Sequence, residues 1–185
     1  MSTQRFEGKV AIVTGGSMGI GRATALQLAR EGAHVVACAR RKPRLDELAA
    51  EIAGFGGKFT PVELDVGNLD DFAKLIAETA AEHGRLDVLV NNAPSVIGGM
   101  VLDQNIEDWR ANFGVCVESV FIGVQAALKI MQPQGSGSII NISSVSSLRA
   151  GMAAGAYSAA KAAVNQFSML SLIHISEPTR PILVS

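Results

Sequence analysis

Short, continuously apolar runs alternate with longer amphipathic segments along most of the chain. Apolar runs such as KVAIVTG at 9–15 and HVVACA at 34–39 predict strands buried on both faces. Between them, segments such as GRATALQLAREG at 21–32 repeat their apolar residues with the period of a helix. Since buried parallel strands need helices on both faces, the alternation predicts an α/β fold with an open, doubly wound, Rossmann-like sheet.

The same alternation continues to about residue 167. Three more strands are predicted from KFTPVELDV at 58–66, RLDVLVNNA at 85–93 and GSIINISS at 137–144. Four more helices are predicted at 43–56, 69–84, 106–131 and from 154 onward. In such a sheet, ligands bind beyond the carboxyl ends of the strands, so residues that follow strands are candidates for a site.

Composition indicates one folded domain without a charged partner. The 185 residues are 48% hydrophobic and carry a net charge of −1, which favours neither nucleic acid nor an anionic membrane surface. The N-terminus lacks an apolar signal core, and no stretch approaches about 20 uncharged apolar residues, so we expect a cytoplasmic protein without a membrane span. Cys38 and Cys116 are interpreted as reduced core thiols, and no metal site is predicted.

A glycine-rich turn, TGGSMGIG at 14–21, joins the first strand to the first helix. Glycines let a backbone approach a pyrophosphate closely, and the helix N-terminus offers amides and a positive dipole end. The spacing is G-x-x-x-G-x-G without a following Lys-Ser/Thr, which disfavours a nucleotide triphosphate loop. The turn therefore predicts a dinucleotide site; the alternative is a tight strand–helix joint.

The end of the second strand favours NADP(H) over NAD(H). An acidic residue there would hold a ribose 2′-hydroxyl, but the sequence reads ACARRK at 37–42. Arginine forks match the geometry of a phosphate, so Arg40 and Arg41 are predicted to bind the 2′-phosphate. The alternative is a solvated basic helix start; a nucleic-acid patch is disfavoured because no aromatic residues interleave with the short basic run.

Tyr157 and Lys161 are spaced so that both side chains leave the same face of the alanine-rich helix at 154–167. A free phenol ionises near pH 10, and a neighbouring cation lowers that value toward neutrality. The pair is therefore a candidate for proton transfer; the alternative is an exposed tyrosine beside a solvated lysine.

These motifs, in this order, resemble the short-chain dehydrogenase/reductase family from Phe6 to about Met169. TGGSMGIG looks like its cofactor loop, NNA at 91–93 like its NNAG motif, and YSAAK at 157–161 like its YxxxK. The resemblance implies a catalytic set of Asn112, Ser144, Tyr157 and Lys161. With the preceding arguments it implies cofactor contacts at Gly15, Ser17, Met18, Gly19, Ile20, Gly21, Arg40, Arg41, Asp65, Val66, Asn92, Ala93, Tyr157 and Lys161.

The resemblance also implies a reaction, namely interconversion of a carbonyl compound and a secondary alcohol with NAD(P)H. Ser144 would bind the reacting oxygen and Tyr157 would exchange its proton. Lys161 would lower the pKa of Tyr157 and hold the nicotinamide ribose, and Asn112 would position a water that connects Lys161 to solvent. Ser143, Ser146 and Ser147 remain alternatives to Ser144, and Asn112 can also be an ordinary polar helix residue. Relatives pair subunits through the equivalents of helices 106–131 and 154–167, so a homodimer or homotetramer is expected.

Two features depart from the family pattern. Pro94 replaces the glycine of NNAG, and we expect this to be tolerated because the segment is already extended. Residues 170–180, LSLIHISEPTR, resemble a transposase-type sequencing adapter read in frame, so residues 1–169 are predicted as a truncated cofactor-binding domain and 170–185 as a non-native tail.

Such a truncation would leave the sheet incomplete, with the fifth strand as an open apolar edge. It would also make cofactor binding and turnover poor, or cause aggregation. A non-catalytic nucleotide-binding protein and an inert fragment therefore stay open as alternative functions.

Overall fold

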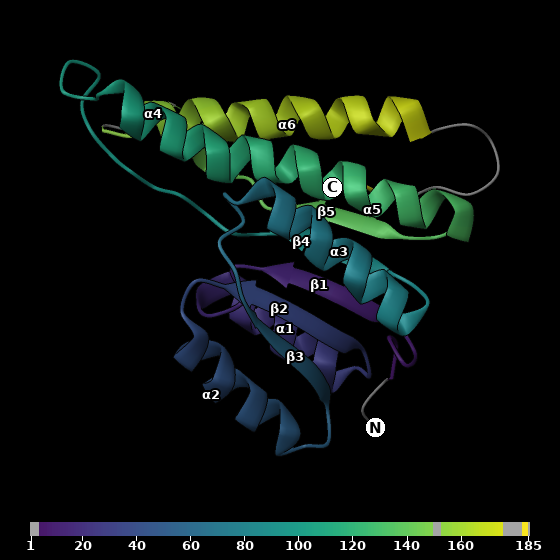
Figure 1. Ribbon diagram of the computed structural model, residues 1–185. Helices are drawn as coiled ribbons and strands as arrows, with labels where there is room; N and C mark the ends of the chain where they lie inside the picture. Colours follow the sequence, from purple (N-terminus) through teal and green to yellow (C-terminus); the bar gives the residue numbers. More distant parts are fainter. Residues whose placement is uncertain (1–3, 150–152, 176–182, 185) are drawn as a thin grey trace.

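A parallel sheet with strand order β3-β2-β1-β4-β5-β6 forms the centre of the computed structural model, which describes residues 4–149, 153–175 and 183–184 (Figure 1). Every neighbouring pair of strands is parallel. The strands are β1 (Val10–Thr14), β2 (His34–Ala39), β3 (Lys58–Glu63), β4 (Val88–Asn91), β5 (Ser138–Asn141) and β6 (Leu183–Val184). The predicted doubly wound α/β fold is thereby confirmed.

Helices cover both faces of the sheet, as the apolar strands require. They are α1 (Gly19–Arg30), α2 (Lys42–Ala53), α3 (Leu69–His83), α4 (Ile106–Phe113), α5 (Ser119–Gln134) and α6 (Gly155–Ile175). A π-helical turn, Gly114–Glu118, joins α4 to α5, so the predicted long helix at 106–131 is continuous but not uniformly α-helical. The combined helix and α6 lie side by side across the top of Figure 1.

Two hydrophobic clusters form the core, one on each face of the sheet. Alternate residues of β1 belong to different clusters, because successive side chains of a strand point to opposite faces. Ile12 packs with Phe72, Leu89, Met131 and Val164 from the side of α3, α5 and α6. Ala11 and Val13 join the cluster on the side of α1 and α2. All five residues of β1 are buried, which is why its sequence is apolar up to the final Thr14.

The edge beyond β5 differs from the expectation of an open strand. The short strand β6 pairs with Ser138 and Ile139, so the predicted open edge is wrong for the first half of β5. Residues 170–175 continue α6 beyond the predicted boundary at 169. Residues 176–182 and 185 of the predicted non-native tail lie outside the described residues, and its non-native origin stays a prediction.

One helical span, Ile106–Gln134, is long and apolar enough to cross a membrane by length and composition, with a mean hydropathy of 1.6, although the sequence analysis found no such stretch. A core helix of a soluble protein passes the same test. Its second half packs against α3, and its π-helical turn packs against α6.

The sheet places candidate ligand sites at one point. From β1 the chain builds outward through β2 to β3, then returns to the other side of β1 to form β4 and β5. The connections that follow β1 and β4 therefore lead to helices on opposite faces of the sheet, which leaves a crevice at this switch point. The glycine turn follows β1 and the NNA sequence follows β4, so both predicted motifs lie at this crevice.

Candidate active site

The glycine turn after β1 is shaped by close backbone contacts. A Cβ atom on Gly15 would lie 2.9 Å from Ala93 Cα, and one on Gly21 would lie 2.4 Å from Asn92 Nδ2. Gly19 has a φ of +55°, and a Cβ there would meet nothing within 4 Å. Gly15 and Gly21 thus permit tight packing, while the turn around Gly19 presents an open backbone at the start of α1. This open turn fits a pyrophosphate, which binds helix N-termini through backbone amides.

Thr14 fastens the glycine turn to the segment after β4. Its hydroxyl oxygen accepts hydrogen bonds from the backbone N–H groups of Asn92 at 2.9 Å and Ala93 at 3.0 Å. The Asn92 side chain donates to the Thr14 carbonyl at 3.0 Å. Sequence analysis did not single out Thr14 as a site residue. The sequence feature that could have indicated its role is a hydroxyl residue at the end of an otherwise apolar strand.

A cavity of about 490 Å³ lies along this crevice. It contains every predicted cofactor contact except Gly21, Tyr157 and Lys161. Pro94, Ser95 and Val115 also line it, so the substituted NNAP segment is part of its wall. Eleven predicted residues meet there: Gly15, Ser17, Met18, Gly19, Ile20, Arg40, Arg41, Asp65, Val66, Asn92 and Ala93.

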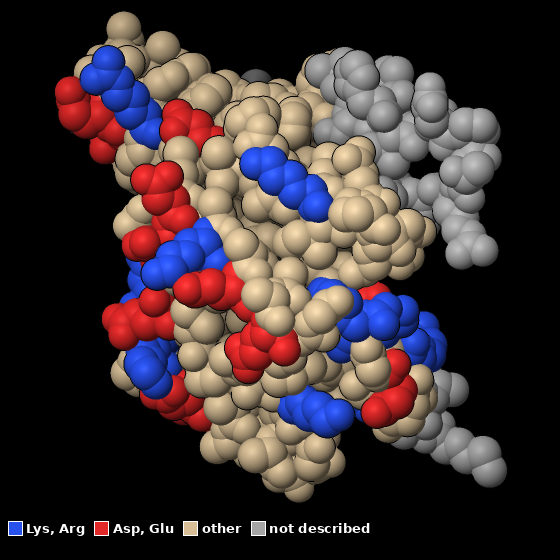
Figure 2. Space-filling model, turned by 45° about the vertical axis from the view of Figure 1, so that its right-hand side comes forward, with Lys and Arg blue, Asp and Glu red and all other residues tan. Residues whose placement is uncertain are grey.

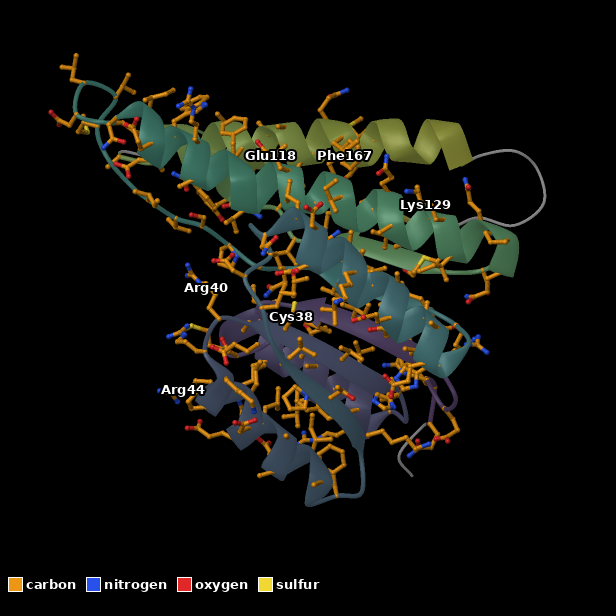
Figure 3. All side chains as sticks on the ribbon, viewed as in Figure 1. Cys38, Arg40, Arg44, Glu118, Lys129 and Phe167 are labelled. Carbon is orange, nitrogen blue, oxygen red and sulfur yellow. The ribbon has the colours of Figure 1, made fainter. Side chains whose placement is uncertain are left out.

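Two arginines supply positive charge at the outer end of the cavity. Arg40 is 73% exposed and lies 3.8 Å from the Asp65 carboxylate, which is a loose ion pair. Figure 3 shows its side chain pointing out toward solvent. Arg41 donates to the Met18 sulfur at 2.6 Å. An exposed guanidinium with one distant partner can still bind a phosphate group.

Tyr157 and Lys161 are brought together on α6, as their spacing predicted. The Lys161 ammonium lies 5.9 Å from the centre of the Tyr157 ring. Its side chain is almost fully buried, and Nζ donates to the Ile142 carbonyl at 2.7 Å. Burial lowers the pKa of Lys161, and an electrostatic interaction with Cys116 partly opposes that shift. The two side chains are thus neighbours, with the lysine buried beneath the helix that carries both.

The serines after β5 differ in their hydrogen-bond partners. The Ser143 hydroxyl donates to the Lys161 carbonyl at 3.4 Å, and the Ser147 hydroxyl accepts from Asn165 at 2.7 Å, so both are used in holding α6. Ser144 Oγ accepts from the Ser146 N–H at 3.1 Å. Among the described residues no group accepts a hydrogen bond from the Ser144 hydroxyl. Ser144 therefore keeps a donor for a ligand oxygen, while Ser146 is not distinguished by its partners.

Asn112 is fully buried but is not bonded to Lys161. Its Oδ1 accepts from the Ile97 N–H at 3.1 Å, and its Nδ2 donates to the Ile97 and Asp108 carbonyls at 3.0 Å each. All three bonds go to the backbone of the segment after β4 and of α4. The bonds of Ser143 and Ser147 thus bring the segment that carries Ser144 to α6, whereas Asn112 has a separate set of partners.

Cys116, interpreted from sequence as a core thiol, lies in the π-helical turn that follows Asn112 on the same continuous helix. It is fully buried, and its sulfur both accepts from the Ser95 N–H at 3.4 Å and donates to the Ser95 carbonyl at 3.3 Å. The sequence feature that could have indicated its role is its position four residues after Asn112, about one helical turn away. In the described part of the chain, no cluster of acidic, histidine or cysteine side chains could hold a metal ion.

Known proteins share this sequence and arrangement. The family model described as short chain dehydrogenase matches residues 9–176. A 3-oxoacyl-acyl-carrier-protein reductase of Thermotoga maritima is 39% identical over 160 residues, which is 86% of this chain and 65% of the relative. A 3beta-hydroxysteroid dehydrogenase of Mediterraneibacter gnavus is 40% identical over 163 residues, 87% of this chain and 58% of the relative.

The fold agrees with solved structures. A short-chain type dehydrogenase/reductase from Mycobacterium marinum superposes with a TM-score of 0.90 at 32% identity, covering 98% of this chain and 75% of that one. The chain thus spans about two thirds or less of the curated relatives it matches. From the family match and the shared architecture, we conclude that the chain belongs to the short chain dehydrogenase family.

Proposed function

We propose that this protein is an NADP(H)-dependent oxidoreductase that interconverts a carbonyl compound and a secondary alcohol. The observation that supports this most is the pair of Tyr157 and buried Lys161 on α6, which is bonded to the carboxyl end of β5 in the same sheet that carries the glycine-turn cavity. Relatives named as a reductase and a hydroxysteroid dehydrogenase act within the same reaction class.

Tyr157 is the proton-transfer group in this proposal. During reduction its hydroxyl donates a proton to the carbonyl oxygen, and during oxidation the phenolate accepts one from the alcohol. The Lys161 ammonium, 5.9 Å from the centre of the Tyr157 ring, supplies the positive charge next to this proton-transfer group. Ser144 donates a hydrogen bond to the same substrate oxygen. The bound nicotinamide supplies or accepts the hydride.

Different residues of the cavity would bind different parts of the cofactor. Amides of the glycine turn would hold the pyrophosphate, and Asp65 and Val66 would contact the adenine. Arg40 and Arg41 would bind a 2′-phosphate, which favours NADP(H), and Lys161 would hold the nicotinamide ribose. Asn112 would act by fixing the segment after β4, since its side-chain bonds go to Ile97 and Asp108.

An apolar substrate fits the surroundings of Tyr157. Two segments flank the start of its helix, 95–104 and 145–148, and both expose large apolar side chains. Val101 and Val145 are each 82% exposed, and Leu102 is 97% exposed. Apolar side chains that face water at a site gain free energy when a ligand covers them, about 25 cal/mol for each Å². We infer a small, apolar carbonyl compound as the substrate class.

The outer face of α5 and α6 supports a homo-oligomer. A shallow groove there is lined mainly by apolar side chains, and the rings of Phe121 and Phe167 lie 5.8 Å apart in it. Figure 3 labels Phe167 on α6 and Glu118 at the end of the π-helical turn that precedes α5. Figure 2 shows few charged side chains over the upper part of the molecule, where these helices lie. A second copy of the chain would cover this face. Light scattering after size exclusion would measure the molar mass and hence the number of subunits.

The function is tested by cofactor binding and turnover together. NADPH and NADH are titrated by fluorescence, and turnover of apolar ketones is measured for the wild type and Tyr157→Phe. We expect tighter binding of NADPH and turnover that Tyr157→Phe abolishes without loss of binding. Binding with turnover that does not depend on Tyr157 would favour a nucleotide-binding role, and absence of binding would refute the proposal.

A further inference from the structure

The segment at 95–104, named here the wall segment, is fastened to the rest of the site at several points. Cys116 bonds both backbone groups of Ser95, and Asn112 bonds both backbone groups of Ile97. Both side chains come from the combined α4–α5 helix and are fully buried. The first part of the wall segment is thus held to that helix.

Its middle is held to the start of α6 through the backbone. The Gly99 N–H donates to the Ala153 carbonyl at 2.8 Å, and Gly99 forms an isolated parallel bridge with Ala154. A Cβ atom on Gly98 would lie 2.9 Å from the Ala153 carbonyl oxygen, so the approach needs glycine there. Ala153 has a φ of +57°, a conformation that non-glycine residues adopt rarely. The contact between the two segments is therefore close and specific.

Gln104 joins both sides of this contact with one side chain. Its Oε1 accepts from the Ala156 N–H at 3.3 Å, and its Nε2 donates to the Ile97 carbonyl at 3.3 Å. The Ala156 amide lies in the first turn of α6, where backbone N–H groups have no acceptor within the helix. Gln104 thus caps α6 from another element, one residue before Tyr157.

We propose that Gln104 is a positioning residue that sets the place of Tyr157 relative to the wall segment on which the substrate lies. Neither of its two hydrogen bonds involves a group of the proposed proton transfer. Its effect passes through Ile97 on one side and through the first turn of α6 on the other. The substrate side of this inference rests on the proposed function, whereas the fastening of the two segments does not.

Two variants separate the two bonds. Gln104→Met keeps the length of the side chain and removes both bonds. Gln104→Glu keeps an oxygen that accepts from the Ala156 N–H, at a helix N-terminus where negative charge is favourable, but cannot donate to the Ile97 carbonyl. We expect Gln104→Met to lower kcat and raise KM, each about tenfold, because the Ala156 N–H loses its acceptor and the Ile97 carbonyl keeps only its bond from Asn112. In Gln104→Glu we expect kcat to recover while KM stays raised.

Hydrogen exchange of backbone amides gives a readout that needs no activity. In Gln104→Met, exchange at Ile97, Gly99 and Ala156 should quicken, while amides of β1 remain as protected as in the wild type. The matched control is Gln132→Met, at an exposed glutamine near the far end of α5. This variant should leave the exchange rates of all these amides unchanged.

The outcomes are distinguishable. Unchanged exchange at all three amides overturns the inference, and so does an equal loss of kcat in both variants of an active enzyme. Local exchange changes in a protein without any turnover support the fastening by Gln104 and contradict the proposed function instead.

Discussion

The buried charged groups at the two ends of the sheet differ in how many hydrogen-bond partners they have. At the amino end, Asp87 is 7% exposed and accepts hydrogen bonds from Arg85 at 2.6 and 2.7 Å, from Lys9 at 3.1 Å and from the Val10 N–H at 2.9 Å. Burial alone would raise the pKa of Asp87, but these hydrogen bonds hold it below its ordinary value. This carboxylate is fully partnered and ties β1 to β4.

At the carboxyl end, Lys161 is 3% exposed, and the Ile142 carbonyl is its one hydrogen-bond acceptor in the described residues. Burial lowers the pKa of this ammonium. A buried charge with many partners stabilises a fold, whereas one with few partners costs stability and remains available to a ligand. The comparison therefore indicates that the charged group at the amino end stabilises the fold, whereas the one at the carboxyl end is available for a reaction.

The largest effect should come from removing the charge of Lys161. We expect Lys161→Met to lower kcat by about 10²- to 10⁴-fold, since proton transfer through Tyr157 loses its neighbouring cation. The free energy of unfolding should stay within about 1 kcal/mol, because an apolar side chain of similar length needs no desolvation. Steady-state kinetics and urea unfolding measure the two quantities. A variant that unfolds much more easily than the wild type would break the comparison.

Asp87→Asn should have the reverse profile. We expect it to lower the free energy of unfolding by about 3 kcal/mol, because Arg85 and Lys9 lose their shared carboxylate. NADPH affinity should be unchanged in the folded protein, since Asp87 lies at the opposite end of the sheet from the cavity. Asp46→Asn is the control: its exposed pair with Lys42 should be worth less than about 1 kcal/mol. Equal losses in both variants would contradict the role given to Asp87.

Arg40→Ala should have a smaller and more selective effect. The guanidinium is loosely paired with Asp65, so its loss should hardly affect folding. We expect the Kd for NADPH to rise about tenfold while the Kd for NADH stays constant, because a charge-assisted bond to the 2′-phosphate is lost. Arg44→Ala, an exposed arginine on α2 labelled in Figure 3, is the matched control. Equal weakening of both cofactors would rule out recognition of the 2′-phosphate by Arg40.

The smallest effects concern the pH dependence of stability. Asp87 has a lower pKa folded than unfolded, so its contribution is complete above the unfolded value and is lost as pH falls through the folded value. Lys161 also has a lower pKa folded than unfolded, so its cost is present at neutral pH and disappears as pH rises toward the unfolded value. Denaturation across pH should show a flatter acid limb in Asp87→Asn and a flatter alkaline limb in Lys161→Met.

Much of this division could be predicted from local sequence. The order of strands and helices follows from apolar periodicity, and the glycine turn and the spacing of Tyr157 and Lys161 are local patterns. The hydrogen bonds of Thr14 and Gln104 could not be predicted, because each joins segments that only the folded chain brings together. The pairing of β6 with β5 depends on such long-range contacts too.

The roles of Asn112 and Cys116 show a different limit. The two residues lie about one turn apart on what the sequence predicts as a single regular helix. Which groups each of them bonds depends on how that helix packs. The π-helical turn at Gly114–Glu118 changes the rotation between them, and periodicity of the sequence does not reveal it. Only the packed structure shows that Cys116 bonds Ser95 and Asn112 bonds Ile97, so that both hold the wall segment.

The central claim is that the carboxyl end of the sheet carries out hydride transfer with Tyr157 as proton donor. Its most direct test uses NADPH deuterated at the reactive carbon of the nicotinamide and an apolar ketone, with the product examined by mass spectrometry. The account predicts one deuterium on the carbinol carbon with the wild-type protein and no labelled alcohol with Tyr157→Phe. A folded protein that binds NADPH but forms no labelled alcohol, or equal labelling with both proteins, would contradict it.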